Sequence, residues 1–572
     1  MSQMKKYLSF FRMRFLMGLQ YRAAAAAGVV TQFTWGFMEL LVFRAFYQAD
    51  ASAFPMSFEA VASYIWLQQA FLALFMAWMM EAEIFSSIVD GNIAYEMCRP
   101  VHIYSMWFAR SVANRVSKAL LRCAPILVVA LFLPKPYRLM LPQDPMTLFL
   151  FLLTMILGTL VTVAIGVIIY TSCCFTISAQ GIRIFYASAC ELLSGQIVPL
   201  PFMPEVVQRV LKVLPFAAMQ NVPFRIYSGD LSGRAMAEAI FLQIFWLIVL
   251  VAGGWMFAKF AEKKIVVQGG GVMERMNRRI EKNKNRNHNG NQNEKRHRKR
   301  SRGNMKAENA RISAVRLYLH YISIHIRSAM QYKTSFFLTT LGQFLFSFNV
   351  FMGITFMFQR FHEVKGFTYS EVLICYALVL VEYSLAEMFA RGFDSFSGMV
   401  RHAEFDRVLV RPRNEILQVL GSKFELSRIG RSFQAIILFI YGVMHVQIDW
   451  NLPRILTVIF MLIGGAAVFS GLFMVYAALC FFTLDGLEFM NVLTDGAREY
   501  GKYPIGIYGK RMLQFCTVIV PYALIQYYPL LYLLGRTTSL WNMVMPLFAV
   551  IFLIPCYVLW RVGVRHYKSS GS

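Results

Sequence analysis

Four carboxylates stand where a membrane-spanning helix would otherwise be apolar. Glu488, Asp495 and Glu499 are separated by seven and four residues, a spacing that places them on one face of a continuous helix. Glu191 lies at a similar depth in the corresponding segment of the first half. Charged side chains within a membrane are costly and usually face protein or a water-filled cavity. We therefore predict that these four line a substrate path, suited to a cationic amphiphile, a lipid or an antibiotic. Solvation of Glu499 near the outer surface is the alternative.

Arg-Pro pairs end a polar loop at the same place in each half. Asp90-Gly91 leads to Arg99-Pro100, and Asp406 leads to Arg411-Pro412. Proline fixes its own φ and moves the preceding residue out of the helical region, so each pair marks a break after a short helix. One such loop is commonly a topology anchor alone. Its recurrence in register favours an element on which another protein docks.

A third pair of segments combines prolines with a glutamine. In each half two prolines lie eight residues apart around a Gln, and the residues are Pro215, Gln220 and Pro223, then Pro521, Gln526 and Pro529. Such prolines can bound short helices that enter the outer leaflet and turn back. Ordinary extracellular loops are the alternative.

Motifs for nucleotide hydrolysis and metal binding are absent from the sequence. No G-x-x-x-x-G-K-[ST], G-x-S-x-G or HExxH occurs, and none of the nine cysteines forms a CxxC pair. We therefore predict that the chain is not an enzyme and binds no metal or other cofactor itself. A partner must supply any chemical energy that it uses.

The composition excludes a water-soluble globule. Of 572 residues 57% are apolar and only 15% are charged. Stretches long enough to cross a membrane fall at residues 23–47, 61–80, 119–134, 146–171, 182–200 and 235–260, then at 334–358, 369–390, 432–446, 454–482, 484–503 and 540–561. The stretch 484–503 is too polar by hydropathy alone. We include it because the repeat described next requires it, and because the basic C-terminal tail would otherwise lie outside.

The two halves of the chain are copies of one unit. Gln20-Tyr21-Arg22 returns as Gln331-Tyr332-Lys333, and the two Arg-Pro pairs recur at nearly the same offset. Each copy opens with an amphipathic helix of the kind that lies in the membrane interface. We predict an all-α polytopic membrane protein of two parallel six-helix repeats, residues 1–262 and 311–572, with both termini cytoplasmic.

A basic segment separates the two units. Residues 263–310 hold 15 Lys or Arg against 4 Glu, within a net charge of +26. Such a segment cannot bury enough apolar surface to fold, so we predict a disordered cytoplasmic linker beside anionic lipid headgroups. Nucleic-acid binding is not expected, because no stacking aromatic residues are interleaved with the charges.

This architecture resembles the permease subunits of ATP-binding-cassette exporters of the type-2 group, especially the paired permeases of bacteria. The resemblance rests on the interfacial helix, the six-span unit, the Arg-Pro loops and the run from Pro521 to Pro529. It implies an exporter in the bacterial plasma membrane, in which two normally separate permease units are fused around a central path. It also implies a partner ATPase dimer, which holds ATP and Mg²⁺ and docks on residues 90–100 and 402–412. The outer segments 199–229 and 504–535 would help close the exit.

Two other classes remain open from the residues themselves. A secondary transporter of the major-facilitator kind also has six plus six spans, but its usual Gly-x-x-x-Asp-Arg-x-Gly-Arg loop is missing. A membrane scaffold without transport is the second. The denser acidic stripe in the second half also puts equal duties for the two halves in doubt.

Overall fold

The computed structural model describes residues 3–20, 22–175, 179–264, 313–331, 333–483 and 487–568. Within these ranges the chain is helical almost throughout, as the sequence predicts, with one two-stranded hairpin. The predicted linker, from residue 265 onward, lies outside the described residues, as do Tyr21, Tyr332 and Asp485.

The first half consists of long helices joined by short ones. Its elements are α1 (Gln3–Gly18), α2 (Arg22–Ala49), α3 (Phe58–Ala70), α4 (Leu72–Phe75), α5 (Ala82–Val89), α6 (Ile93–Met97), α7 (Ile103–Phe132), α8 (Pro145–Ser172), η1 (Cys173–Phe175), α9 (Ala179–Leu193), η2 (Leu200–Phe202), α10 (Glu205–Val213), α11 (Asn221–Tyr227) and α12 (Gly233–Lys264).

The second half follows a similar order with more breaks. Its elements are α15 (Ala314–Gln331), α16 (Lys333–Arg360), β1 (Glu363–Val364), β2 (Phe367–Thr368), α17 (Tyr369–Asp394), α18 (Phe396–Arg401), α19 (Glu404–Leu409), α20 (Glu415–Gly421), η3 (Leu426–Arg428), α21 (Ile429–His445), α22 (Leu452–Leu479), η4 (Leu487–Phe489), α23 (Met490–Leu493), α24 (Asp495–Tyr500), η5 (Ile505–Tyr508), α25 (Lys510–Val518), α26 (Tyr522–Ile525), α27 (Tyr527–Leu533), α28 (Leu540–Ala549), η6 (Val550–Phe552) and α29 (Leu553–His566).

Matching helix starts support the duplication. Asp144 caps α8 by accepting from the Thr147 amide, and Asn451 caps α22 by accepting from the Arg454 amide at 3.0 Å. A proline stands in the first turn of both helices, where its missing N–H leaves no bond unmade. The same signals therefore begin equivalent helices in the two copies.

Seven helical segments within the described ranges are long and apolar enough to cross a membrane, and a bent pair makes an eighth. They are 25–49, 145–175, 233–263, 333–360, 369–401, 452–479 and 540–566, with 510–518 plus 522–533 as the bent pair. The other predicted spans correspond to shorter or more charged helices. For example, α9 has 15 residues, and α7 begins with several arginines.

The prediction of one continuous helix over 484–503 is wrong. In place of one helix the structure has η4, α23 and α24, with a break at Thr494, where φ is −108° and ψ is −84°. The segment is rich in ionisable side chains, and the contacts of its described members are given below. Irregular backbone of this kind is tolerated at membrane depth where it is enclosed by protein or lines a cavity.

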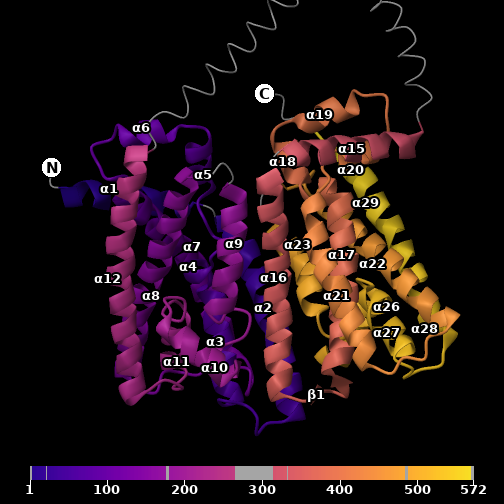
Figure 1. The fold of residues 1–572 in the computed structure, drawn as a ribbon, viewed down its shortest axis with the longest axis horizontal. Coiled ribbons are helices and arrows are strands. Elements are labelled where there is room, and N and C mark those ends of the chain that lie inside the picture. Colours follow the sequence, from indigo (N-terminus) through magenta and orange to yellow (C-terminus); the bar gives the residue numbers. More distant parts are fainter. Residues whose placement is uncertain are drawn as a thin grey trace, which may run out of the picture.

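Figure 1 shows two bundles side by side, one from each half. The interfacial helices α1 and α15 lie across one end, together with α6, α19 and both chain termini; we call this the terminal end (Figure 1). The short helices α10, α11, α26 and α27 and strand β1 lie at the opposite end, which we call the far end (Figure 1). The loops predicted to be cytoplasmic therefore share one end with both termini.

A continuous hydrophobic core joins the bundles along a seam where α9 packs on α16. Gly342 of α16 permits this approach, because a Cβ there would lie 2.7 Å from Ile184 Cγ2. Asn349 Nδ2 donates to the Ser188 carbonyl across the same contact. Phe46 adds an aromatic contact to Phe361, with ring centroids 5.2 Å apart. The halves are therefore packed directly against each other.

Candidate functional site

The first Arg-Pro loop is held by the interfacial helix α1. α5 ends at Val89 with Asp90 as its C-cap, and Gly91 follows with φ +77°, a conformation that favours glycine. Arg99 and Pro100 lie, as predicted, between α6 and α7, and both are exposed. Lys6 Nζ donates to the Pro100 carbonyl at 3.5 Å, so α1 fixes the place at which this loop is presented.

The second loop is held by a buried aromatic residue and a tyrosine. Phe405 of α19 is fully buried, and its ring lies 5.1 Å from that of Phe396. The Tyr567 hydroxyl donates to Asp406 Oδ1 at 2.8 Å, and burial together with Asp406 raises the pKa of Tyr567 to about 12. Arg411 and Pro412 follow and are exposed, between α19 and the short helix α20.

Both loops present apolar side chains that stay exposed among the described residues. Tyr95 is 76% exposed and Val89 is 62% exposed in the first loop, and Val410 is 85% exposed in the second. Exposed apolar side chains grouped at one end of a protein, beside charged residues, are typical of a protein-binding surface. We call the exposed residues of α5–α6 and α19 with their Arg-Pro pairs the paired loops.

Two of the predicted path carboxylates, one from each half, lie near Arg498 at the seam. Glu191 of α9 interacts electrostatically with Glu499 of α24 and with Arg498. Glu499 forms an ion pair with Lys502 at 2.7 Å, and their side chains keep 19% and 16% of their surface exposed. Charged side chains from both halves therefore meet at the seam and are not fully covered.

The other two carboxylates are held separately. Glu488 pairs with Arg122 of the first half at 2.8 Å, which is an ionic contact across the seam. Asp495 accepts from the Tyr383 hydroxyl at 2.8 Å and pairs with Arg498 at 3.6 Å. Because the helix breaks at Thr494, the predicted single acidic face is corrected to separate sites. Whether any of the four carries substrate stays a prediction.

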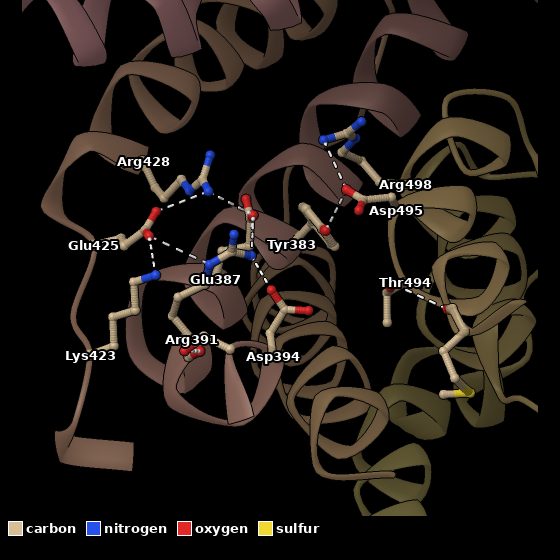
Figure 2. A network of polar contacts seen from close by, with 12 residues as sticks. Tyr383, Glu387, Arg391, Asp394, Lys423, Glu425, Arg428, Thr494, Asp495 and Arg498 are labelled. Atoms are coloured by element: carbon tan, nitrogen blue, oxygen red, sulfur yellow. Dashed lines mark hydrogen bonds and ion pairs between the residues drawn. The ribbon is translucent and has the colours of Figure 1, made fainter. Parts of the chain in front are cut away.

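A buried ionic network lies beside these residues (Figure 2). Glu387 of α17, only 3% exposed, contacts Arg391 at 3.2 Å, Arg428 at 3.2 Å and Arg431 at 2.7 Å. Arg391 also pairs with Asp394. One carboxylate thus joins α17, η3 and α21.

Glu425 connects the network to the segment that follows α20. It pairs with Arg428 at 2.9 Å, with Lys423 at 3.4 Å and with Arg391 at 3.5 Å (Figure 2). Burial alone raises the pKa of Glu425, but the three cations outweigh it and hold the pKa below the ordinary glutamate value. The carboxylate is therefore ionised at neutral pH.

Two arginines stack on one phenylalanine ring between the buried network and the seam. Arg431 and Arg498 both lie over the Phe346 ring, at 5.2 Å and 5.1 Å from its centroid. Arg498 in turn interacts with Glu191. Ion pairs and cation–π contacts therefore run from Glu425, after the second paired loop, to Arg498, whose charge acts on Glu191 at the seam.

The proline-rich segments form short helices at the far end. Pro223 and Pro529 each stand in the first turn of a helix, and the chain bends by 89° between α25 and the segment 522–533. Gln526 holds this bend, since its Nε2 donates to the carbonyls of Gly501 and Tyr503 at 2.8 Å each. Gln220 is also buried, but its Nε2 has no partner within the described residues.

The far-end prolines lie where the chain turns. Pro215 separates α10 from α11, and Pro521 separates α25 from α26. These positions agree with short helices that turn back, although closure of an exit by them stays a prediction.

Sequence reasoning missed the basic partners of the site. Arg122, Arg428 and Arg431 each pair with a carboxylate of the site, yet none belongs to a recognisable motif. The sequence feature that could have indicated these basic partners is the number of arginines next to apolar stretches. Across the described residues no group of three or more His, Cys, Asp or Glu side chains is placed to hold a metal ion.

The fold and the duplicated loops define a polytopic all-α membrane protein built from two copies of one permease-like unit. A family model described as ABC-2 family transporter protein matches the chain twice, over residues 33–267 and 344–571, so the chain belongs to that family. This confirms the resemblance and makes the chain a multi-pass ABC-type permease with two fused units. No curated protein and no solved structure matches the chain.

Proposed function

We propose that the chain is the membrane part of an ATP-driven exporter, coupled to a separate ATPase dimer. The family match in two copies supports this proposal, since each copy supplies one permease unit. ATP and Mg²⁺ belong to the partner, and this chain contributes no catalytic residue. The proposed location is a bacterial plasma membrane with both termini in the cytoplasm.

The paired loops carry the proposal. They lie at the same end as both termini (Figure 1), and they present Tyr95 and Val410 without covering them. Two similar surfaces on one chain suit a partner that is itself a dimer of similar subunits. ATP-driven closure of that dimer would press on both loops and shift the two bundles between packings.

The seam is the proposed substrate path. Glu191 and Glu499 come from different halves, meet there and are incompletely covered, so a change in packing between the bundles changes what they contact. Two carboxylates favour a cationic or zwitterionic amphiphile. Transport outward, or sideways into the bilayer, follows from the same movement.

Docking is tested by co-purification of the tagged full-length chain with its co-expressed ATPase. The double variant Tyr95→Asp with Val410→Asp places charges on the paired loops and is expected to abolish co-purification. Leu141→Asp is the matched control, because Leu141 is 73% exposed but follows α7 at the far end. Retention of the ATPase by the double variant would remove the paired loops from the proposal.

The path is tested with ATP-dependent uptake of ethidium, a cationic amphiphile, into inverted vesicles. Glu191→Gln with Glu499→Gln is expected to reduce uptake while leaving ATPase co-purification intact. Glu238→Gln, an exposed carboxylate on α12, is the control. Unchanged uptake in the double variant would return both carboxylates to a structural role.

A further inference from the structure

A cavity of about 720 Å³ opens between the two halves at the far end. Its walls come from α10 and the segment before it, from the end of α11 and the turn after it, and from the last residues of α16. Four cations and two carboxylates line it: Arg209, Lys212, Arg225, Arg360, Glu205 and Asp230. The cavity is therefore wide enough for a lipid headgroup and carries an excess of positive charge.

Ion pairs within the wall leave two cations uncompensated. Arg225 pairs with Asp230 at 2.5 Å, and Arg209 pairs with Glu205 at 3.5 Å. In the part of the chain that the structure describes, neither Lys212 nor Arg360 forms an ion pair. An anion of charge one or two would restore neutrality.

Arg360 is fixed in place by neutral groups. Its Nε donates to the Ala53 carbonyl and its Nη1 to the Pro201 carbonyl at 3.0 Å. Its Nη2 makes no hydrogen bond to a described residue. Backbone carbonyls orient a guanidinium without cancelling its charge, so Arg360 is a preformed donor for an anionic oxygen.

α10 has three distinct faces, which follow from about 100° of rotation per residue. Val206, Val210 and Val213 form one stripe, and they are 70%, 58% and 65% exposed. Leu211 is buried against the protein on a second face. The third face carries Glu205, Gln208, Arg209 and Lys212, all of which line the cavity.

The valine stripe therefore runs next to the polar stripe on the same short helix. An exposed apolar stripe beside a cationic one is the arrangement of a helix that lies between acyl chains and headgroups. A soluble anion could use the cations but would leave the valines uncovered. An amphiphile uses both.

We propose that this cavity binds an anionic phospholipid, with its phosphodiester between Arg360 and Lys212 and its acyl chains along the valine stripe of α10. The site lies at the end opposite the paired loops and needs no ATPase for binding. Loss of lipid binding at the cavity and loss of ATPase docking on the paired loops are therefore separate experimental outcomes.

The experiment is native mass spectrometry of the full-length chain, purified in a neutral detergent and titrated with lipid. Phosphatidylglycerol is expected to bind more tightly than phosphatidylcholine with the same acyl chains. Arg209→Glu with Lys212→Glu should lower the affinity for phosphatidylglycerol by roughly tenfold, because two attractive charges become repulsive. Equal binding of the two lipids, or an unchanged affinity in this variant, would overturn the proposal.

Arg234→Glu is the matched control. Arg234 pairs with Glu238 four residues on, just as Arg209 pairs with Glu205 four residues earlier, but it does not line the cavity. Its replacement should leave phosphatidylglycerol affinity unchanged, and an equal loss there would show a general charge effect and overturn the assignment.

Glycerol 1-phosphate separates a lipid site from a site for any phosphate. Glycerol 1-phosphate should compete poorly with phosphatidylglycerol for the cavity, because it cannot cover the valines. Val210→Ser should lower the affinity for phosphatidylglycerol without changing the affinity for glycerol 1-phosphate. Competition at equal affinity would assign the cavity to a soluble phosphate and refute the lipid.

Discussion

Replacement of Glu387 by glutamine tests the buried network most directly. Arg391 would keep Asp394 and Glu425, and Arg428 would keep Glu425. Arg431 is 7% exposed and has no other carboxylate contact among the described residues, so it would be left as an uncompensated buried charge. Breaking one side of a buried ion pair costs about 3–5 kcal/mol. Because the other arginines keep partners, Arg431 accounts for most of the expected loss.

The assay is a double-mutant cycle on unfolding of the purified chain in mixed micelles of maltoside and dodecyl sulfate. Glu387→Gln, Arg431→Met and their combination are compared with the parent chain. If the unpaired charge is the cause, the double variant should be more stable than the sum of the single losses predicts, by about 1–3 kcal/mol. Glu404→Gln, at an exposed site on α19, is the control. Additive losses, or a loss below about 1 kcal/mol for Glu387→Gln, would refute this reasoning.

Three further outcomes are expected. Either Arg122→Glu or Glu488→Arg alone should lower the melting temperature, and the two together should restore it, because the exchange keeps one charge of each sign. The two side chains are 11% and 33% exposed and form a partly screened ion pair between the halves. A double variant that melts no higher than the single variants would contradict the pairing. Gly342→Ala should lower the melting temperature, whereas Gly166→Ala should not, because a Cβ at Gly342 lies 2.7 Å from a neighbouring side chain and one at Gly166 meets nothing within 4 Å. The pKa of Glu425 is lowered on folding, so its stabilisation is complete above the ordinary value of 4.5 and is lost as the pH falls through the lower folded value. Glu425→Gln should therefore be less stable than the parent chain at pH 7, with a gap that narrows below pH 4.5 in thermal unfolding; a constant gap would contradict this assignment.

Periodicity and repetition predicted the class of fold. The long apolar helices begin at signals that the sequence displays, such as Asp144 and Asn451 ahead of a first-turn proline. The repeat also indicated that the Arg-Pro pairs would take equivalent places. These features depend on residues close together in the chain, which is why they can be predicted from the sequence.

The break at Thr494 could not be predicted in the same way. Helical spacing of Glu488, Asp495 and Glu499 describes a face only while the helix continues. Glu488 pairs with Arg122, 366 residues earlier, and Asp495 accepts from Tyr383, 112 residues earlier, whereas Glu499 pairs with the nearby Lys502. The contacts of Glu488 and Asp495 depend on how distant helices pack, which no spacing rule within one segment describes.

Only part of the site could be predicted from the sequence, because many of its contacts join residues that are far apart in the chain. Glu191 and Glu499 were named from their types and depth, and in the structure the charge of Arg498 acts on both of them; their role in a substrate path stays a prediction. Glu387 has a local partner in Arg391, four residues later, but another of its three arginines is Arg431, 44 residues later. No spacing rule connects residues on different helices, so the network became visible only with the packing of α17 on α21.

The two halves stabilise buried arginines near corresponding places by different means. Arg115 of α7 donates to the carbonyls of Leu74 and Met76, at 3.0 Å each, and to that of Met79 at 3.1 Å. Arg428 instead pairs with carboxylates, among them Glu387. Carbonyls are fixed in charge, whereas carboxylates respond to a neighbouring charge or proton. A movement of the second paired loop would therefore meet a charge network that extends towards the seam. The first paired loop has carboxylate contacts of its own, because Arg110 of α7 pairs with Glu81 and with Glu83 of α5. We therefore expect the two copies to differ in how far their charge networks extend.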